Sequence, residues 1–231
     1  RIIAGDCQLD RAALMRRGEQ VAAGLAAMGI GQGDVVAVLL RNGMPYLEII
    51  QACKRLGCYY CPINWHYTPD EVAYLVRDSG ARLLIAEEDL WQAARAALPA
   101  DLPSRRVGAA AVSEDYASWR EAQAPYDGPL VAPRGHMAYT SGTTGRPKGV
   151  VRAPFPLDQL AQRLAAVEAV VEQAYGLRPG CRALLPAPVY HSAPSVFAQV
   201  ALRVCETLVL APRFDPLEVL RLIERHRIDT V

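Results

Sequence analysis

Short apolar runs that alternate with helix-like stretches most strongly limit the folds open to this 231-residue chain. Val35–Leu40 is apolar at every position and has the length of a strand, which is typical of a strand buried on both faces of a sheet. Further strands are predicted at Cys58–Ile63, Arg82–Ala86, His136–Thr140, Arg182–Leu185 and Thr207–Leu210. This alternation predicts an α/β fold with mostly parallel sheets and helices on both faces.

Two segments carry clear signals for the start of a helix. Thr68-Pro69-Asp70-Glu71 offers a capping hydroxyl, a proline at the first helical position and a glutamate three residues after the cap. Asp215-Pro216-Leu217-Glu218 repeats the design. Helices are also predicted from Asp10 to Gly29 and at Pro45–Leu56, Asp89–Leu98, Leu157–Tyr175, Pro194–Val204 and Glu218–Arg227. We expect Pro99–Pro133 to be a long connection with one short helix, and Ile228–Val231 to begin another strand.

The overall charge argues against a nucleic-acid partner, because the formal net charge is only +1 and basic and acidic residues are mixed throughout. No apolar run has the length of a transmembrane segment, and the segment Arg1–Gly5 lacks the layout of a signal peptide. We therefore expect a cytoplasmic protein with reduced thiols. Cys58 and Cys61 have the spacing of half a zinc site, but no second pair follows, so we predict no metal there.

The segment Tyr139–Gly149, called the hydroxyl-rich loop below, carries the strongest chemical signal. Its hydroxyl side chains and glycines surround Lys148, which is one of only two lysines in the chain. Glycines let backbone N–H groups approach an anion, and hydroxyls and an ammonium group can bind phosphate oxygens. Pro147 before the lysine and Gly149 after it exclude the common P-loop, which needs glycine before and Ser or Thr after. From composition alone, a polar turn without a ligand stays an alternative.

The complete string, Tyr-Thr-Ser-Gly-Thr-Thr-Gly-Arg-Pro-Lys-Gly, resembles the signature loop of the adenylate-forming superfamily, which includes acyl-CoA synthetases and the adenylation domains of peptide synthetases. The resemblance extends over nearly the whole chain. It includes Leu25–Ala37, Ala52–Gly57, Pro188–Pro194 and Ile223–Ile228. Residues 1–231 are therefore expected to form part of an AMP-binding N-terminal domain, most like that of a fatty-acid–CoA ligase.

The resemblance implies ATP-dependent activation of a carboxylic acid through an acyl-adenylate, followed by transfer to coenzyme A, with Mg²⁺ as the metal. It assigns phosphate contacts to Thr140, Ser141, Gly142, Thr143, Thr144, Gly145 and Lys148. Lys148 is also expected to act in catalysis, and Thr140 to ligate magnesium. A homodimer is left open.

The pair Tyr190-His191 resembles an aromatic–histidine pair that lies beside the substrate carboxylate in this family. We therefore assign both residues to the substrate pocket and His191 also to catalysis. Relatives that activate amino acids usually carry an aspartate in this region, but no acidic residue occurs from Tyr190 to Phe197. Because a buried ammonium group needs a counter-charge, a fatty or other non-amino acid is favoured. The apolar residues up to Ala201 suit an acyl chain or an ordinary buried helix equally well.

Several family motifs do not occur before Val231: the adenine-binding segment with its glutamate, the aspartate that holds the ribose, and the C-terminal domain with its lysine. We therefore expect the C-terminal domain to be absent and this polypeptide alone to be inactive. Two alternatives stay open. One alternative to an acyl-CoA synthetase is a nucleotide-binding or structural fragment without turnover, and the other is an adenylation module that loads a carrier-protein thiol. Arg152-Ala153-Pro154 also replaces a hydroxyl–histidine pair that many relatives carry, which leaves the cap of the next helix unassigned.

Overall fold

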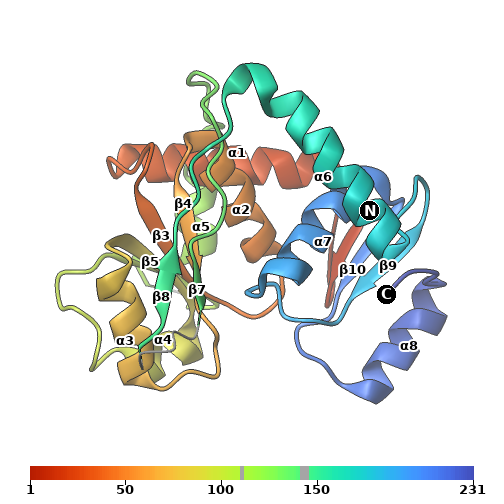
Figure 1. The fold of residues 1–231 in the computed structure, drawn as a ribbon. Helices are drawn as coiled ribbons and strands as arrows, with labels where there is room; N and C mark the ends of the chain where they lie inside the picture. The colour runs from red at the N-terminus through yellow and green to blue at the C-terminus, as the bar shows by residue number, and fades with distance from the viewer. Residues whose placement is uncertain (110–111, 141–145) are drawn as a thin grey trace. The chain divides into compact units, whose positions relative to one another are not determined.

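The computed structural model describes residues 1–109, 112–140 and 146–231, and strands and helices alternate along them (Figure 1). The chain divides into two compact units. The first contains Arg1–Leu14, Arg41–Tyr46 and Pro156–Val231, and the second contains Met15–Leu40 and Leu47–Phe155. Each unit has its own mostly parallel sheet, which confirms the predicted α/β class.

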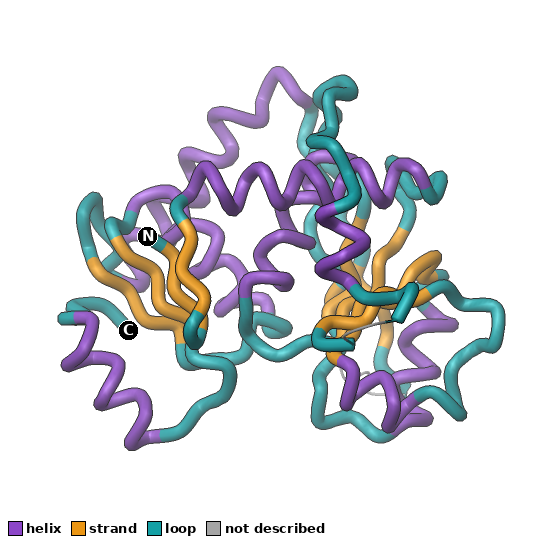
Figure 2. The backbone as a smooth tube through the Cα atoms, turned by 180° about the vertical axis from the view of Figure 1, so that it is seen from behind, coloured by secondary structure: helices purple, strands orange, loops and turns teal. Residues whose placement is uncertain are grey.

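The sheet of the first unit has four strands in the order β2-β1-β10-β9. Their bounds are Ile2–Ala4 for β1, Cys7–Leu9 for β2, Arg182–Leu185 for β9 and Thr207–Leu210 for β10. Strands β1, β10 and β9 are parallel, whereas β2 is antiparallel to β1. The strands of this sheet lie side by side next to the N label of Figure 2. The amino-terminal strand therefore completes a sheet whose other parallel strands come from the end of the chain.

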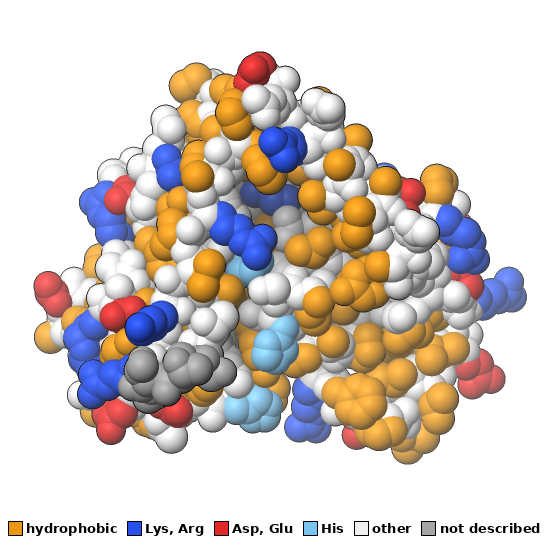
Figure 3. Space-filling model, in the orientation of Figure 1, with side chains coloured by type: hydrophobic (Ala, Val, Ile, Leu, Met, Phe, Trp, Pro, Cys, Tyr) orange, Lys and Arg blue, Asp and Glu red, His pale blue; other side chains and the backbone are white. Residues whose placement is uncertain are grey.

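The helices of the first unit are α6 (Leu160–Tyr175), α7 (Ser192–Val204) and α8 (Pro216–His226), with a 3₁₀ turn at Leu157–Gln159, and α6 packs against α7. Helix α7 contacts β9 and β10. One side of α8 packs through Leu222 and its neighbours on a buried cluster that includes Leu184 and Val209. Phe214, Leu217 and Leu220 are exposed, so apolar side chains also gather on the outer surface over α8 (Figure 3).

The second unit contains a fully parallel sheet in the order β4-β3-β5-β6. Its strands are β3 (Val35–Leu39), β4 (Tyr59–Pro62), β5 (Ala81–Glu87) and β6 (Ser104–Val107). Strands β7 (Ala138–Thr140) and β8 (Lys148–Val150) form a separate antiparallel pair, called the β7–β8 hairpin below. The helices are α1 (Arg11–Ala27), α2 (Met44–Leu56), α3 (Pro69–Asp78), α4 (Glu88–Ala94) and α5 (Tyr116–Glu121).

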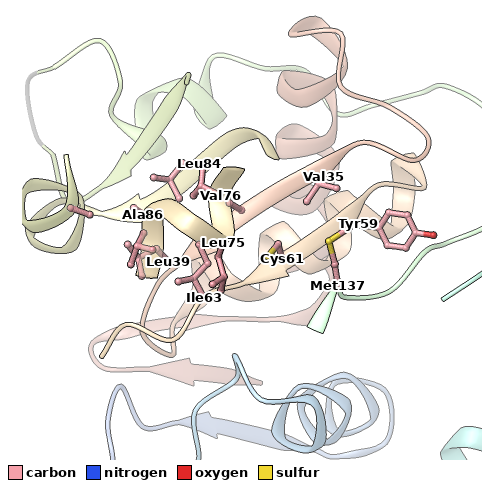
Figure 4. Packing of buried hydrophobic residues seen from close by; sticks show 13 residues of the cluster. Val35, Leu39, Tyr59, Cys61, Ile63, Leu75, Val76, Leu84, Ala86 and Met137 are labelled. Atoms are coloured by element: carbon pink, nitrogen blue, oxygen red, sulfur yellow. The ribbon is translucent and has the colours of Figure 1, made fainter. Parts of the chain in front are cut away.

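Side chains on both faces of this parallel sheet are buried, as its apolar strands predict. On one face, Leu39, Cys61 and Leu84 belong to a cluster that includes Leu75 of α3 and Met137 (Figure 4). Alternate residues of a strand point to opposite faces. Val36, Val38, Leu83 and Ile85 therefore point to the other face, and they are fully buried too.

A buried charge cluster connects α5 to α2. The Glu48 carboxylate is fully buried and lies 3.1 Å from Nη1 of Arg120, and it accepts a 2.9 Å hydrogen bond from the Tyr116 hydroxyl. Arg17 approaches the other carboxylate oxygen at 3.3 Å. Burial, followed by the Glu48 charge, raises the pKa of Tyr116 well above its usual range. Because its partners satisfy the buried carboxylate, the cluster holds α5 in place.

The helix-start predictions are confirmed where hydrogen bonds test them. Thr68 and Glu71 form a reciprocal capping box at α3, and the Asp215 side chain accepts a hydrogen bond from the Glu218 backbone N–H at α8. Asp10 likewise accepts from the Ala13 N–H before α1. Helix α6 begins without a side-chain cap, directly after the 3₁₀ turn.

Four strands were not predicted. Strands β1 and β2 are only three residues long, and β6 is half-buried at a sheet edge, with polar residues at three of its four positions. Strand β8 is exposed throughout. Among the differences in extent, α4 ends at Ala94, before the predicted Leu98. The predicted strand at Ile228–Val231 is a single bridge between Thr230 and Ala183.

Candidate functional site

The β7–β8 hairpin brings the two ends of the hydroxyl-rich loop together. Thr140 and Lys148 are direct partners across the two strands, and Tyr139 is the partner of Gly149. Directly opposed residues of an antiparallel pair project to the same face. The hydroxyl of Thr140 and the ammonium group of Lys148 therefore share one face, and both residues are exposed to solvent.

Five of the predicted phosphate contacts, at Ser141, Gly142, Thr143, Thr144 and Gly145, lie outside the described residues. Their roles stay predictions. The structure places the two residues that flank this segment in the β7–β8 hairpin, Thr140 and Lys148, because they pair across the two strands.

Two tyrosine hydroxyls attach the β7–β8 hairpin to helix α3. The Tyr74 hydroxyl donates a 2.9 Å hydrogen bond to the Pro147 carbonyl, and the Arg146 guanidinium lies 5.2 Å from the centre of the Tyr74 ring. On the other strand, the Tyr139 hydroxyl donates to Asp78 Oδ2 at 2.7 Å. Both strands of the hairpin are thus attached to the same helix. Sequence reasoning missed Tyr74 and Asp78, because nothing in the α3 sequence marks contacts 73 and 61 residues away.

Gly149 has a steric role in the hairpin in addition to its place in the motif. A Cβ atom at this position would lie 3.1 Å from Cζ of Tyr139, so the Tyr139 ring lies directly against the β8 backbone. Burial, followed by the hydrogen bond to Asp78, raises the pKa of Tyr139. The phenol therefore stays protonated and keeps donating to the carboxylate at physiological pH.

The strand that enters the loop is attached to the parallel sheet of the second unit. His136 forms a parallel bridge with Tyr60 of β4, and the Met137 N–H donates to the Tyr60 carbonyl at 2.8 Å. Because this segment runs parallel to β4, β7 leads toward the carboxyl end of β4. Ligands of open α/β sheets bind at that end. Burial, followed by the positive charge of Arg152, lowers the pKa of His136.

The second predicted site lies in the first unit, in Pro186–His191, which is called the β9–α7 turn below. It also follows the carboxyl end of a strand. The rings of Tyr190 and His191 are adjacent, with centroids 4.5 Å apart. His191 immediately precedes α7, its carbonyl accepts from the Ser195 N–H at 3.0 Å, and the residue is exposed. The structure thus brings the two predicted pocket residues together.

Asn42 holds the β9–α7 turn from inside the first unit. Its side-chain amide donates to the carbonyls of Ala187 and Ala211, each at 2.9 Å, and its oxygen accepts from the Val189 N–H at 2.8 Å. The side chain is buried, so these bonds satisfy polar groups that water does not reach. Sequence reasoning missed Asn42. The available signal was its position two residues after the buried run Val35–Leu40.

The β7–β8 hairpin and the Tyr190-His191 pair belong to different compact units. The described site residues therefore fall into two sets. Within the described ranges, no group of three or more His, Cys, Asp or Glu side chains could hold a metal ion. Within the same ranges, no helix has the length and apolarity needed to cross a bilayer.

A family model for AMP-binding enzymes matches residues 2–231. The chain belongs to the AMP-binding enzyme family. It is 37% identical over 145 residues to the fatty acid–[acyl-carrier-protein] ligase ScoC of Streptomyces coeruleorubidus, covering 61% of this chain and 27% of that protein. It is 31% identical to the long-chain-fatty-acid–CoA ligase FadD13 of Mycobacterium tuberculosis, covering 88% of this chain and 40% of that one.

A solved structure shows the same fold. The inhibitor-bound N-terminal domain of FACL13 from Mycobacterium tuberculosis superimposes with a TM-score of 0.79 at 27% identity, over 98% of this chain and 56% of that one. This AMP-binding chain therefore spans less than half the length of the curated relatives it matches.

Proposed function

We propose that this AMP-binding chain serves an enzyme that uses ATP to convert a carboxylic acid into an acyl-adenylate and then passes the acyl group to a thiol. The observation that most supports this proposal is the pairing of Thr140 with Lys148 at the two ends of the hydroxyl-rich loop. The pairing presents both side chains on one exposed face. A family member with this loop has the groups needed to bind a polyphosphate.

Lys148 would hold the β- and γ-phosphates together with the loop backbone. Negative charge grows on the departing pyrophosphate as the carboxylate attacks the α-phosphorus, and a fixed cation stabilises that charge. Lys148 is exposed on its strand, so its ammonium group is free to reach a ligand beyond the hairpin. The Thr140 hydroxyl is an oxygen donor suited to Mg²⁺, which usually takes its other ligands from water and phosphate oxygens. Bound Mg²⁺ would neutralise phosphate charge.

The proposed acid is a fatty acid or another acid without an amino group. Its carboxylate would lie beside His191 and Tyr190, and no acidic residue between Tyr190 and Phe197 could balance an ammonium group. The names of ScoC and FadD13, both fatty-acid ligases, support the same class. The apolar side of α7 gives no further support, because Phe197 and Ala201 are buried in a helix that packs on β9 and β10.

Coenzyme A is the proposed thiol, as it is for FadD13 by its name. A carrier-protein thiol is the second candidate, because the 37% identical ScoC is named as an acyl-carrier-protein ligase. A third reading, in which residues 1–231 bind nucleotide without turnover by themselves, is compatible with a chain that spans 40% of FadD13. We propose that turnover requires the full-length enzyme.

One product assay with the full-length protein separates the two thiol candidates and tests the proposed activity. The full-length protein is incubated with ATP, Mg²⁺ and a panel of fatty, aromatic and amino acids, and pyrophosphate release is measured. Coenzyme A or a pantetheinylated acyl carrier protein is then added, and thioesters are identified by mass spectrometry. We expect release with non-amino acids and thioester formation with coenzyme A. Thioester on the carrier protein alone would select the second candidate, and release with none of the acids would refute the proposed activity.

A further inference from the structure

Two cysteine side chains meet at the amino ends of neighbouring strands in the first unit. The sulfur atoms of Cys181 and Cys205 lie 2.7 Å apart. Cys181 directly precedes β9, and Cys205 directly follows α7 and leads into β10. Both residues are only 2% exposed. Neither has a part in the proposed chemistry, since the Tyr190-His191 pair lies at the opposite end of α7.

Backbone hydrogen bonds hold the segments that carry these two cysteines side by side. The Glu206 N–H donates to the Cys181 carbonyl at 2.8 Å, and the Gly180 N–H donates to the Val204 carbonyl at 3.2 Å. Arg182, which follows Cys181, is the register partner of Thr207 in adjacent parallel strands, so Cys205 lies one residue before the position directly opposite Cys181. Such strands lie about 4.8 Å apart, and disulfide-bonded Cα atoms usually lie about 4.4–6.8 Å apart. Because the two sulfur atoms already lie 2.7 Å apart, the bond requires only a further small approach of the side chains.

A bound metal explains the sulfur contact less well than a covalent link does. Each thiolate ligand of zinc lies about 2.3 Å from the ion, so two ligands at a tetrahedral angle would hold their sulfur atoms well beyond 2.7 Å. The described residues also offer no cluster of three potential ligands. The sulfur distance falls between that of an unbonded pair and the bond length of about 2.05 Å.

We propose that Cys181 and Cys205 form an intramolecular disulfide when the protein meets oxidised glutathione or a similar disulfide. The Cys205 thiolate attacks one glutathione sulfur, which forms a mixed disulfide and releases one glutathione thiolate. The Cys181 thiolate then attacks the Cys205 sulfur and releases the second glutathione. The two cysteines lose two electrons and two protons, and one molecule of oxidised glutathione is reduced to two thiols.

Burial raises the pKa of several thiols in this chain, Cys205 included. The Cys58 thiol donates to the Gly31 carbonyl at 3.1 Å, and burial raises its pKa to about 12. Burial also raises the pKa of Cys61 to about 12. For Cys205, burial and then the neighbouring Cys181 thiol raise the pKa. Oxidation of the folded protein should therefore be slow, because the thiolate is the reactive form, and the buried bond should resist reductants once it has formed.

The bond would link the end of α7 to the start of β9 and close a loop between residues 24 positions apart. A cross-link across a loop of this length restricts the unfolded chain. We expect the oxidised protein to melt about 5–10 °C above the reduced protein. Arg11 also donates to the Cys205 carbonyl, which already fixes this corner of the first unit.

The test maps the bond in the full-length protein after equilibration in oxidised-glutathione buffer. Free thiols are alkylated under denaturing conditions before trypsin is added. We expect one linked pair that joins residues 164–182 to residues 204–213, two hydrogen masses below the sum of the reduced peptides. The matched control Cys7→Ser should keep this pair, because Cys7 is partly exposed and has no role in the link. Cys181→Ser should abolish both the pair and the oxidation-dependent melting shift.

Full alkylation of both cysteines after equilibration would overturn the proposal, as would a Cys205–glutathione adduct that persists when Cys181 is present. A wild-type link without any melting shift would contradict the stabilising role. Because the mapping uses the wild-type protein, the result does not depend on whether a serine variant folds.

Discussion

The β7–β8 hairpin and the β9–α7 turn each present candidate site residues just beyond a strand, but they are held in different ways. The hairpin is attached to α3 through the Tyr74 and Tyr139 hydroxyls at its edges, and Lys148 is exposed. The β9–α7 turn is held from inside by three hydrogen bonds of the buried Asn42 side chain. The comparison separates residues that carry chemistry from residues that position them. Replacing the first kind should alter rates, and replacing the second kind should alter stability.

The largest effect is expected for Lys148→Ala in the full-length protein. Losing the cation that faces the leaving pyrophosphate should slow acid-dependent pyrophosphate release about 100- to 1,000-fold. The melting temperature should not change, because Lys148 is exposed. Arg16→Ala, which removes another exposed cation, is the matched control and should keep the wild-type rate. A Lys148→Ala variant that releases pyrophosphate normally would remove Lys148 from the phosphate site.

Asn42→Ala should show the opposite pattern. It removes three hydrogen bonds and leaves the Val189 N–H and two carbonyls without their partner, so we expect a loss of about 2–3 kcal/mol in the free energy of unfolding. Urea denaturation measures this loss. Asn64→Ala is the control, because the bond that its side chain accepts from the His66 N–H at 3.0 Å is exposed, and its loss should cost less than about 1 kcal/mol. Equal losses of unfolding free energy in both variants would contradict the role of Asn42 in holding the β9–α7 turn.

A smaller effect on rate is expected for His191→Ala. Losing one contact to the substrate carboxylate should cost about 1.4 kcal/mol, which is about tenfold in the specificity constant for the acid. His66→Ala is a close control, because His66 is also exposed and its ring also stacks on a preceding aromatic residue, Trp65. Steady-state kinetics with varied acid should separate the two variants. If both keep the wild-type specificity constant, His191 has no role in the pocket.

The smallest effect is expected for Tyr139→Phe, which removes the bond to Asp78 at a cost of about 0.5–1.5 kcal/mol. Because the pKa of Tyr139 is raised in the folded protein, the fold favours the protonated phenol. Its stabilising contribution is therefore complete below the ordinary tyrosine pKa of about 10 and is lost as pH rises further. The stability difference between wild type and Tyr139→Phe should be constant from about pH 7 to 9 and shrink above about pH 10. A stability difference between the two proteins that grows above about pH 10 would contradict the raised pKa of Tyr139.

Local signals in the sequence predict much of this fold. The apolar runs locate β3, β9 and β10 almost to the residue, and the Thr68 capping box locates the start of α3. Strand β6, Ser104-Arg105-Arg106-Val107, carries no such signal, because only backbone pairing with β5 makes it a strand.

The site residues also differ in how far the sequence predicts them. Thr140 and Lys148 are recognisable because the motif is contiguous in sequence. Asn42 is not, since its role depends on Ala187 and Ala211, which the fold brings to it from more than 140 residues away.

The most direct test of the central claim, that the hydroxyl-rich loop serves formation of an acyl-adenylate, is ATP–pyrophosphate exchange in the full-length protein. Labelled pyrophosphate enters ATP only if the adenylate forms reversibly on the enzyme. We predict exchange that requires a non-amino carboxylic acid, needs no thiol and is largely lost in Lys148→Ala. Exchange that proceeds without any acid, or that is equally fast in Lys148→Ala, would contradict the account.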